Sequence, residues 1–194
     1  AYGDGIRILS QEPWETVCSF IISQNNNIPR IKKIITAMSA RLGRPAGDHT
    51  DEKMRGHLSD IMKSGAYTFP TPEAIRSNGI ALLAELRTGF RAKYIYDAAD
   101  KFSSGEISAQ MISDAPDTVA AAEILKTIKG VGPKVAACAL LFGFERYDAF
   151  PIDVWIRRVM EKYFPADYNA ASLGSYAGIA QQYLFYYERY HGGE

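Results

Sequence analysis

The sequence predicts an all-α protein built from about ten short helices. Apolar residues recur at helical spacing along most of the chain, and no segment shows the strict alternation that is typical of a half-buried strand. Capping residues and prolines precede several apolar stretches, and glycines follow several of them, as at helix starts and stops. Hydrophobic residues make up 47% of the 194 residues, which is enough for a substantial core.

The first predicted helix begins at Pro13, because proline fits the first turn of a helix, where its missing N–H removes no hydrogen bond. Its apolar residues Val17, Phe20 and Ile21 share one face and should be buried. The asparagines at 25–27 then break the helix and form a loop.

A second helix is predicted over residues 28–42, with Asn27 as its N-cap and Pro29 in its first turn. Gly43 follows the last apolar residue and should end the helix. Residues 43–70 are polar and glycine-rich, and they show no clear periodicity. The apolar stripe of the second helix consists of Ile31, Ile34, Ile35, Met38 and Leu42.

The middle of the chain should contain three further helical segments. Residues 71–79, TPEAIRSNG, combine a threonine cap, a proline start and a glycine stop. The apolar segment 80–86 follows directly. A corner at 87–94, RTGFRAKY, leads into a helix that continues through Phe102.

A helical hairpin is predicted at residues 128–144, IKGVGPKVAACALLFGF. Glycine tolerates positive φ, so Gly130 and Gly132 allow backbone amides to point outward beside the helix that starts at Pro133. Amides at a helix N-terminus bind phosphate well. An ordinary hairpin between two helices with a glycine stop explains the short glycine pattern equally well.

Lys134 follows directly at the start of this apolar helix. A helix N-terminus and a buried setting both disfavour a cation, so we expect part of this amine to be unprotonated and nucleophilic toward a carbonyl-like carbon. A lysine that extends to solvent is the alternative. Asp153 begins the helix predicted over 151–164, where it is expected to be the N-cap. It could also face the lysine and stabilise positive charge. A last helix is predicted over 175–190.

The overall composition gives few hints of a partner. With 22 basic and 22 acidic residues the formal charge is +0, so the overall charge does not indicate a nucleic-acid partner. A local basic surface is still compatible with this composition. Cys18 and Cys138 are too few for a disulfide framework, a cysteine-only zinc site or a four-thiolate iron–sulfur cluster, and should be buried free thiols. No window approaches the length of a membrane span, and no signal-peptide core is present at the start.

Four segments together resemble the helix-hairpin-helix Gly/Pro-Asp (HhH-GPD) DNA glycosylase superfamily, in its branch of 8-oxoguanine DNA glycosylases with AP lyase activity. They are distributed over almost the whole chain: CSFIISQNNNIPRIKKI, GFRAKYI, LKTIKGVGPKVAACALLFGF with AFPIDVWIRRVM, and YAGIAQQYLF. The resemblance implies two helical lobes, 13–129 and 130–194 with 1–12. It also implies an N-terminal antiparallel β domain, which we expect to be absent from this chain.

The resemblance assigns the chemistry to Lys134 and Asp153. Lys134 would attack the sugar C1′ of the damaged nucleotide, and Asp153 would stabilise the developing oxocarbenium ion. The resulting Schiff base would permit strand cleavage by β-elimination. The base must first be flipped out of the duplex, since a stacked nucleotide is not accessible to the enzyme.

Three residues are implied to form the pocket for the flipped base. Cys138 and Phe185 would sandwich it, and Gln181 would bond its Watson–Crick edge. The sequence pattern alone favours Cys138 and Phe185 as ordinary core residues.

Four more residues are implied to act at the base opposite the lesion. Asn25 would fill the gap left by the flipped nucleotide, Arg30 and Arg91 would read the orphaned cytosine, and Phe90 would wedge beside it. Taken singly, an asparagine in a turn and arginines on a solvated surface are the simpler interpretations.

Backbone groups of Gly130, Gly132 and Val135 would hold a DNA phosphate. Trp155 stands where well-known eukaryotic members of the family have a histidine that contacts DNA, so that phosphate contact is in doubt.

We therefore expect an intracellular, monomeric enzyme that acts on double-stranded DNA containing 8-oxoguanine, in the cytoplasm or nucleoid of a prokaryote or the nucleus of a eukaryote. The chemistry requires no cofactor and no metal, and no membrane is involved. One alternative is a glycosylase of the same superfamily that removes another damaged base. The other is a non-catalytic helix-hairpin-helix module that binds DNA and needs neither Lys134 nor Asp153.

Overall fold

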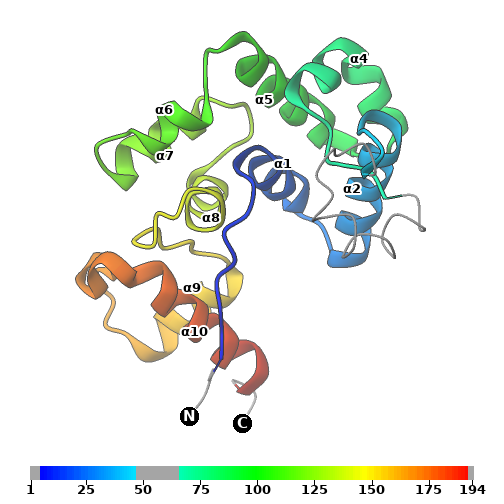
Figure 1. Ribbon diagram of the computed structural model, residues 1–194. Helices are drawn as coiled ribbons and strands as arrows, with labels where there is room; N and C mark the ends of the chain where they lie inside the picture. Colours follow the sequence, from blue (N-terminus) through cyan, green and yellow to red (C-terminus); the bar gives the residue numbers. More distant parts are fainter. Residues whose placement is uncertain (1–4, 47–65, 192–194) are drawn as a thin grey trace. The chain divides into compact units, whose positions relative to one another are not determined.

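The computed structural model describes residues 5–46 and 66–191 (Figure 1). Regular structure in these residues is helical, and the β pairing found in them is an isolated bridge between Pro45 and Tyr67. The all-α prediction is therefore confirmed, while most of the featureless segment 43–70 lies outside the described residues. The helices are α1 Pro13–Ser23, α2 Ile28–Leu42, α4 Pro72–Glu85, α5 Ala92–Ser104, α6 Ala109–Ser113, α7 Thr118–Lys126, α8 Pro133–Gly143, α9 Val154–Tyr163 and α10 Ala177–His191, with 3₁₀ turns η2 Gly89–Arg91 and η3 Ala170–Tyr176.

Packing divides the chain into two compact units. Unit 1 contains Ala1–Phe20 and Ser108–Glu194, and unit 2 contains Ile21–Ile107. These bounds differ from the lobes 13–129 and 130–194 with 1–12 that the resemblance implied. Residues 108–129 fall in unit 1 because α6 packs on α7 and α7 packs on α8, so the two helices of the hairpin stay together.

The helix ends of unit 2 follow the local signals in the sequence. The Asn27 side chain accepts a hydrogen bond of 3.0 Å from the Arg30 amide and caps α2, which ends at Gly43 as predicted. Thr71 caps α4 through the Ala74 amide at 3.3 Å. Gly79, with φ of 77°, interrupts α4 where a glycine stop was expected. These confirmed ends show that short-range capping fixes the helices of this unit.

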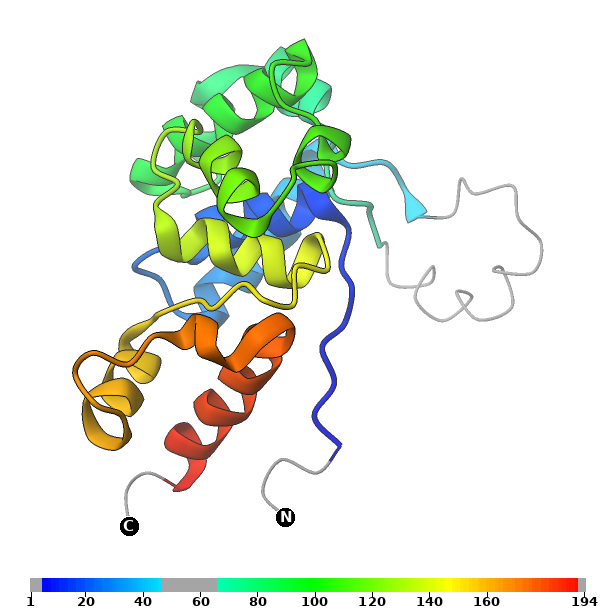
Figure 2. The same ribbon diagram turned by 90° about the vertical axis from the view of Figure 1, so that its left-hand side faces the viewer.

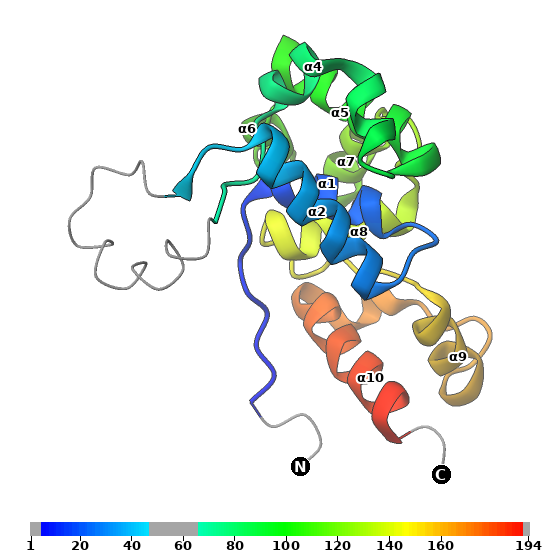
Figure 3. The same ribbon diagram turned by 90° about the vertical axis from the view of Figure 1, so that its right-hand side faces the viewer.

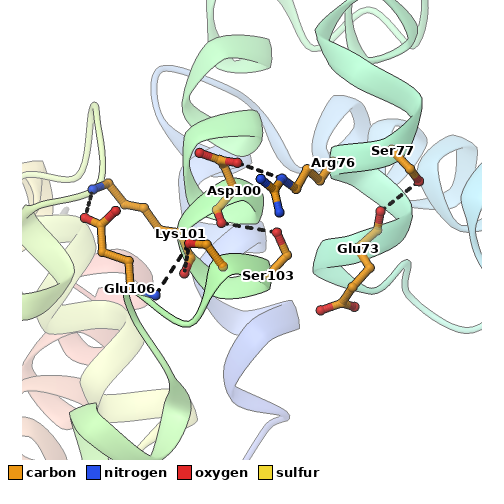
Figure 4. Close-up of polar contacts among 8 residues, drawn as sticks. Glu73, Arg76, Ser77, Asp100, Lys101, Ser103 and Glu106 are labelled. Atoms are coloured by element: carbon orange, nitrogen blue, oxygen red, sulfur yellow. Dashed lines mark hydrogen bonds and ion pairs between the residues drawn. The ribbon is translucent and has the colours of Figure 1, made fainter.

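Unit 2 is held together mainly by α4 on α5, with α2 against α4, as Figure 3 shows. An ion pair of 2.8 Å between Arg76 of α4 and Asp100 of α5 lies at the edge of this packing (Figure 4). Lys101 pairs with Glu106 just beyond the end of α5. Both pairs are partly exposed and each should contribute only about 0–1 kcal/mol, so apolar burial dominates. The buried core residues include Ile34, Met38, Ile75, Leu83 and Ile95.

Unit 1 is built around the helical hairpin of α7 and α8. Asp117 caps α7 by accepting a hydrogen bond of 2.7 Å from the Ala120 amide. Gly130 has φ of 78°, a conformation that favours glycine, and Gly132 precedes α8 as its N-cap. Residues of both helices, of the turn between them and of α9 are fully buried, including Leu125, Ile128, Leu140, Ile156 and Val159. The predicted hairpin is therefore present and well packed.

The start of α10 is fixed against the loop that precedes α9. The Gly178 amide donates a hydrogen bond of 2.7 Å to the Tyr147 carbonyl. A Cβ at Gly178 would lie 2.3 Å from the Ala149 carbonyl oxygen, so glycine is required by this close approach. The same helix packs on η3 and on α9 (Figures 1 and 2). The loop, α9 and α10 thus form one packed assembly within unit 1.

Cys18 and Cys138 are both buried free thiols, as predicted. None of the described helices is long and apolar enough to cross a membrane.

Candidate active site

A pocket of about 270 Å³ opens within unit 1, where α1, α8, α9 and α10 approach one another. Its volume lies just below the range of about 300–1,000 Å³ that is usual for small-molecule sites, which suits a single base. Five residues predicted from the sequence share its wall: Lys134, Cys138, Asp153, Gln181 and Phe185.

Lys134 is placed at the pocket by the start of α8. Pro133 is the first residue of α8, and Gly132 before it adopts an extended conformation with open space around its Cα. The Lys134 side chain is half-buried and its Nζ lies 5.5 Å from the centre of the Phe20 ring. A half-buried amine over an aromatic face is held in the pocket while staying accessible.

Cys138 lies one helical turn after Lys134, near enough for the amine to influence the thiol electrostatically. Burial raises the pKa of the Cys138 thiol to about 11, Lys134 acts in the opposite direction, and Asp153 adds to the increase. The thiol is therefore protonated near neutral pH. A neutral thiol is a poor nucleophile, so the pocket's candidate for nucleophilic attack is the amine of Lys134.

Asp153 caps α9, as the sequence predicted, by accepting a hydrogen bond of 2.9 Å from the Ile156 amide through Oδ1. A carboxylate offers about four acceptor sites, so capping leaves capacity for a charge in the pocket. The cap also fixes the carboxylate relative to the backbone of α9. Asp153 can therefore serve the helix and the pocket at once.

Gln181 and Phe185 come from successive turns of α10. Gln181 is 3% exposed, donates a hydrogen bond of 2.9 Å to the Pro151 carbonyl and accepts one of 2.5 Å from Gln182. These bonds hold its amide in a fixed orientation. The Phe185 ring is half-buried, with the Arg189 guanidinium 5.7 Å from its centre.

The remaining wall of the pocket was not predicted from the sequence. Phe20 was expected in the core but is only half-buried, because its ring faces the pocket and stacks on Phe142 at 5.6 Å. Both aromatic residues lie in apolar stripes, where nothing in the pattern separates a pocket wall from a core residue. The residues of this group are Gln11, Phe20, Phe142, Pro151 and Gln182.

A second cluster of predicted residues lies in unit 2, around the loop at 25–27. Arg91 is 1% exposed, and its guanidinium donates hydrogen bonds to the carbonyls of Gln24, of Asn25 at 2.7 Å and of Thr88 at 3.2 Å. Burial first, and then Arg30, lowers the pKa of Arg91. Arg91, which was predicted to read a base, is thus bonded to the carbonyls that shape the loop. Asn25 adopts φ of 46° and is exposed.

Arg30 and Phe90 are also exposed members of this cluster. Arg30 donates a hydrogen bond of 3.2 Å to the Arg87 carbonyl. Phe90 is 48% exposed, and the Arg91 guanidinium lies 4.4 Å from the centre of its ring. Arg30 and Arg91 both approach Gly89, since a Cβ there would lie 3.8 Å and 3.9 Å from their nitrogens. The exposed Arg30 guanidinium and Phe90 ring are therefore gathered around the buried Arg91.

The predicted phosphate-binding amides lie at the turn between α7 and α8. Gly130 is exposed, Gly132 is half-buried, and the side chain of Val135 is buried beneath the first turn of α8. Trp155 is half-buried with the Arg158 guanidinium 5.1 Å from its ring. A cation therefore stands beside the Trp155 ring.

Several known proteins are similar to this chain over most of its length. The N-glycosylase/DNA lyase of Saccharomyces cerevisiae is 35% identical over 176 residues, which cover 85% of this chain and 43% of the yeast protein. The structure of MBOgg1 in complex with a low-affinity DNA ligand is 43% identical, with a TM-score of 0.82, and the match covers 98% of this chain and 64% of that one.

The 8-oxoguanine glycosylase/lyase of Clostridium acetobutylicum, in complex with double-stranded DNA containing cytosine opposite 8-oxoguanine, is 37% identical. Its TM-score is 0.79, and the match covers 98% of this chain and 64% of that chain. The chain thus spans between 43% and 64% of the length of these three relatives. The family model of HhH-GPD base excision DNA repair proteins matches residues 18–173. The chain therefore belongs to the HhH-GPD superfamily of base excision DNA repair proteins.

Proposed function

We propose that this chain is the helical catalytic part of a DNA glycosylase that removes 8-oxoguanine opposite cytosine and then cleaves the strand as an AP lyase. The observation that carries the proposal is the pocket of unit 1, where Lys134 and Asp153 share a wall with Cys138, Gln181 and Phe185. The relatives named N-glycosylase/DNA lyase and 8-oxoguanine glycosylase/lyase support the choice of reaction and base.

The first step is displacement of the base. The Lys134 amine attacks C1′ and forms a C–N bond, while the glycosidic bond breaks and its electron pair leaves with the base. The Asp153 carboxylate stabilises the positive charge that develops on the sugar, and electrostatic stabilisation of this kind is often the largest contribution to catalysis. The Phe185 ring, the Cys138 thiol and the fixed Gln181 amide provide the stacking surfaces and hydrogen-bonding groups that receive the base.

The second step is strand cleavage. After the amine loses its proton and the sugar ring opens, Lys134 and C1′ form a Schiff base. Loss of a C2′ proton then expels the 3′ phosphate by β-elimination, and hydrolysis of the imine frees the lysine. No external oxidant or reductant is needed for this sequence.

The partner is duplex DNA, with the flipped nucleotide in unit 1 and the opposite base read by unit 2. Arg30, Phe90 and the loop carrying Asn25 supply exposed donors and an aromatic face for an orphaned cytosine. We place this monomeric enzyme in the compartment that holds the genome, the nucleoid or cytoplasm of a prokaryote or the nucleus of a eukaryote.

The test is borohydride trapping on duplexes that carry 8-oxoguanine or another damaged base opposite cytosine. Wild type should form a covalent adduct on 8-oxoguanine·cytosine, and Lys134→Gln should bind the duplex without forming one. An adduct with Lys134→Gln would place the nucleophile elsewhere. Faster trapping on another lesion would favour a glycosylase for a different base, and binding by wild type without any adduct would favour a non-catalytic module.

A further inference from the structure

A second cavity, of about 520 Å³, lies within unit 2 and is separate from the pocket of Lys134. It is a groove between the first turns of α2 and the end of α4, and we name it the basic groove. Three cations, Arg30, Lys33 and Arg87, line it together with one acid, Glu85. All three cationic side chains belong to exposed residues. The groove therefore has an excess of positive charge in a chain whose formal charge is +0.

The N-terminus of α2 adds to this charge. Asn27 and Pro29 line the groove at the start of the helix, where the helix dipole and the first-turn amides favour an anion. Arg30 joins the groove to the surface that carries Asn25 and Phe90, since its guanidinium bonds to the Arg87 carbonyl and approaches Gly89. An anion in the groove would thus lie next to the residues proposed to read the opposite base.

We propose that the basic groove binds the phosphate backbone of the DNA strand opposite the lesion, with Lys33 and Arg87 as its phosphate contacts. The assignment rests on the proposed function, because it is the base-reading role of the neighbouring Arg30 that identifies the strand. Contacts of this kind fix register and raise affinity for every sequence alike. Arg30 serves both surfaces, while Lys33 and Arg87 serve only the groove.

The backbone at Arg87 supports a binding role. Arg87 follows the C-cap residue Leu86 of α4 and adopts φ of 60°, the left-handed conformation that helices usually assign to glycine at this position. Its amide donates a hydrogen bond of 3.0 Å to the Ala84 carbonyl, so the conformation is the ordinary helix end. An arginine there strains the backbone where glycine would not. Its side chain makes no hydrogen bond or ion pair with the rest of the described chain.

Arg87→Gly is therefore the informative variant. It should leave the melting temperature unchanged or raise it, because glycine fits the left-handed position, and it should weaken DNA binding. Loss of affinity without loss of stability separates a ligand contact from a structural residue. Lys33→Ala should weaken binding similarly. Lys32→Ala is the matched control, because Lys32 is an exposed neighbour on α2 that does not line the groove.

The binding experiment uses a duplex with a tetrahydrofuran abasic-site analogue, which has no base to release and stays intact. Each of Lys33→Ala and Arg87→Gly should raise the Kd roughly three- to tenfold near 0.1 M salt. Each should also make the negative slope of log K against log salt shallower by about 0.9. Lys32→Ala should match wild type. Equal affinity and slope for wild type, Lys33→Ala and Arg87→Gly would overturn the proposal and leave the groove open for another occupant.

Two further binding measurements test whether the groove contacts phosphate and whether that phosphate belongs to the strand opposite the lesion. Both variants should weaken binding equally whichever of the four bases lies opposite the lesion; a changed preference would mean that these residues read the base. Methylphosphonates, which remove the phosphate charge, are placed beside the nucleotide opposite the abasic site. They should weaken DNA binding by wild type but not by the variant that combines Lys33→Ala with Arg87→Gly. Equal weakening of both proteins would place the contact elsewhere. If wild type traps no borohydride adduct on 8-oxoguanine·cytosine yet the groove results hold, the proposed function fails while DNA binding by the groove stands.

Discussion

The pocket of unit 1 and the loop cluster of unit 2 place polar groups by different means. In unit 1 the side chains of the pocket are already bonded to protein atoms, as with Asp153 on the Ile156 amide and Gln181 on the Pro151 carbonyl. In the cluster of unit 2, Arg91 is buried and holds the backbone of the loop at 25–27, while Asn25, Arg30 and Phe90 are exposed. Enclosed groups suit chemistry that depends on fixed geometry, whereas exposed groups around one buried anchor suit recognition of a large partner.

The largest expected effect concerns the anchor of unit 2. Arg91→Met should destabilise the protein by about 4 kcal/mol, because the buried carbonyl of Thr88 and the part-buried carbonyls of Gln24 and Asn25 lose their donors at about 1–3 kcal/mol each. Arg30→Met, at an exposed position, should change stability by less than about 0.5 kcal/mol. Urea unfolding of both variants measures the difference. Equal stability would show that Arg91 does not support the loop.

The packing behind the pocket of unit 1 gives the next effect. Gly178→Ala should cost about 3 kcal/mol, at the upper end of overpacking penalties, because its Cβ would meet the Ala149 carbonyl oxygen at 2.3 Å. Gly132→Ala should cost little, since nothing lies within 4 Å of a Cβ there and its φ is −98°. Thermal unfolding compares the two, and a larger loss at Gly132 would contradict the geometry.

The buried thiol predicts a dependence on alkaline pH. The pKa of Cys138 is raised from 9.0 to about 11, so between these values the folded state holds a proton that the unfolded state has lost. The contribution of this thiol to the free energy of unfolding is fully present below pH 9. It is lost as the pH rises through 11, at a cost of about 2 kcal/mol. Cys138→Ala should remove that part of the decline. Unfolding free energies of both proteins at pH 8 and pH 11 test it, and parallel declines would refute the effect.

The smallest effect separates the two roles of Asp153. Asp153→Ala should cost about 1 kcal/mol through the lost cap, while Asp153→Asn should leave stability nearly unchanged because asparagine caps well. Both should slow base excision, since neither side chain carries the charge that faces the sugar. Single-turnover excision and thermal unfolding measured on both variants separate the roles. Unchanged excision in Asp153→Asn would leave Asp153 a helix cap only.

Short-range signals predicted the helices, and long-range packing decided the rest. Asn27, Thr71 and Asp153 cap their helices as expected, because a cap depends on residues only three positions apart. The burial of Arg91 depends on carbonyls more than sixty positions away, which no local pattern encodes. Phe20 shows the same limit, because an apolar helical stripe does not reveal that one ring will face a pocket.

The bounds of the two units likewise depend on packing between helices, which local sequence patterns do not reveal. The resemblance suggested a boundary at the hairpin turn, near residue 129, but the packing of α7 on α8 keeps both arms of the hairpin in unit 1. The family motifs could identify Lys134, Asp153, Cys138, Gln181 and Phe185 as candidates, and these residues do meet in one pocket. Phe20, Phe142 and Gln182 also line the pocket and lie inside these motifs, but nothing in the sequence marked them as pocket residues.

The raised pKa of Cys138 has a consequence for chemical durability. Peroxides attack the thiolate rather than the thiol, and with a pKa of about 11 only about one molecule in ten thousand carries the thiolate at pH 7. The proposed function, repair of oxidised guanine, would place this protein where oxidants are present. The pocket thus keeps a polarisable sulfur in its wall while withholding the ionised form that oxidants consume.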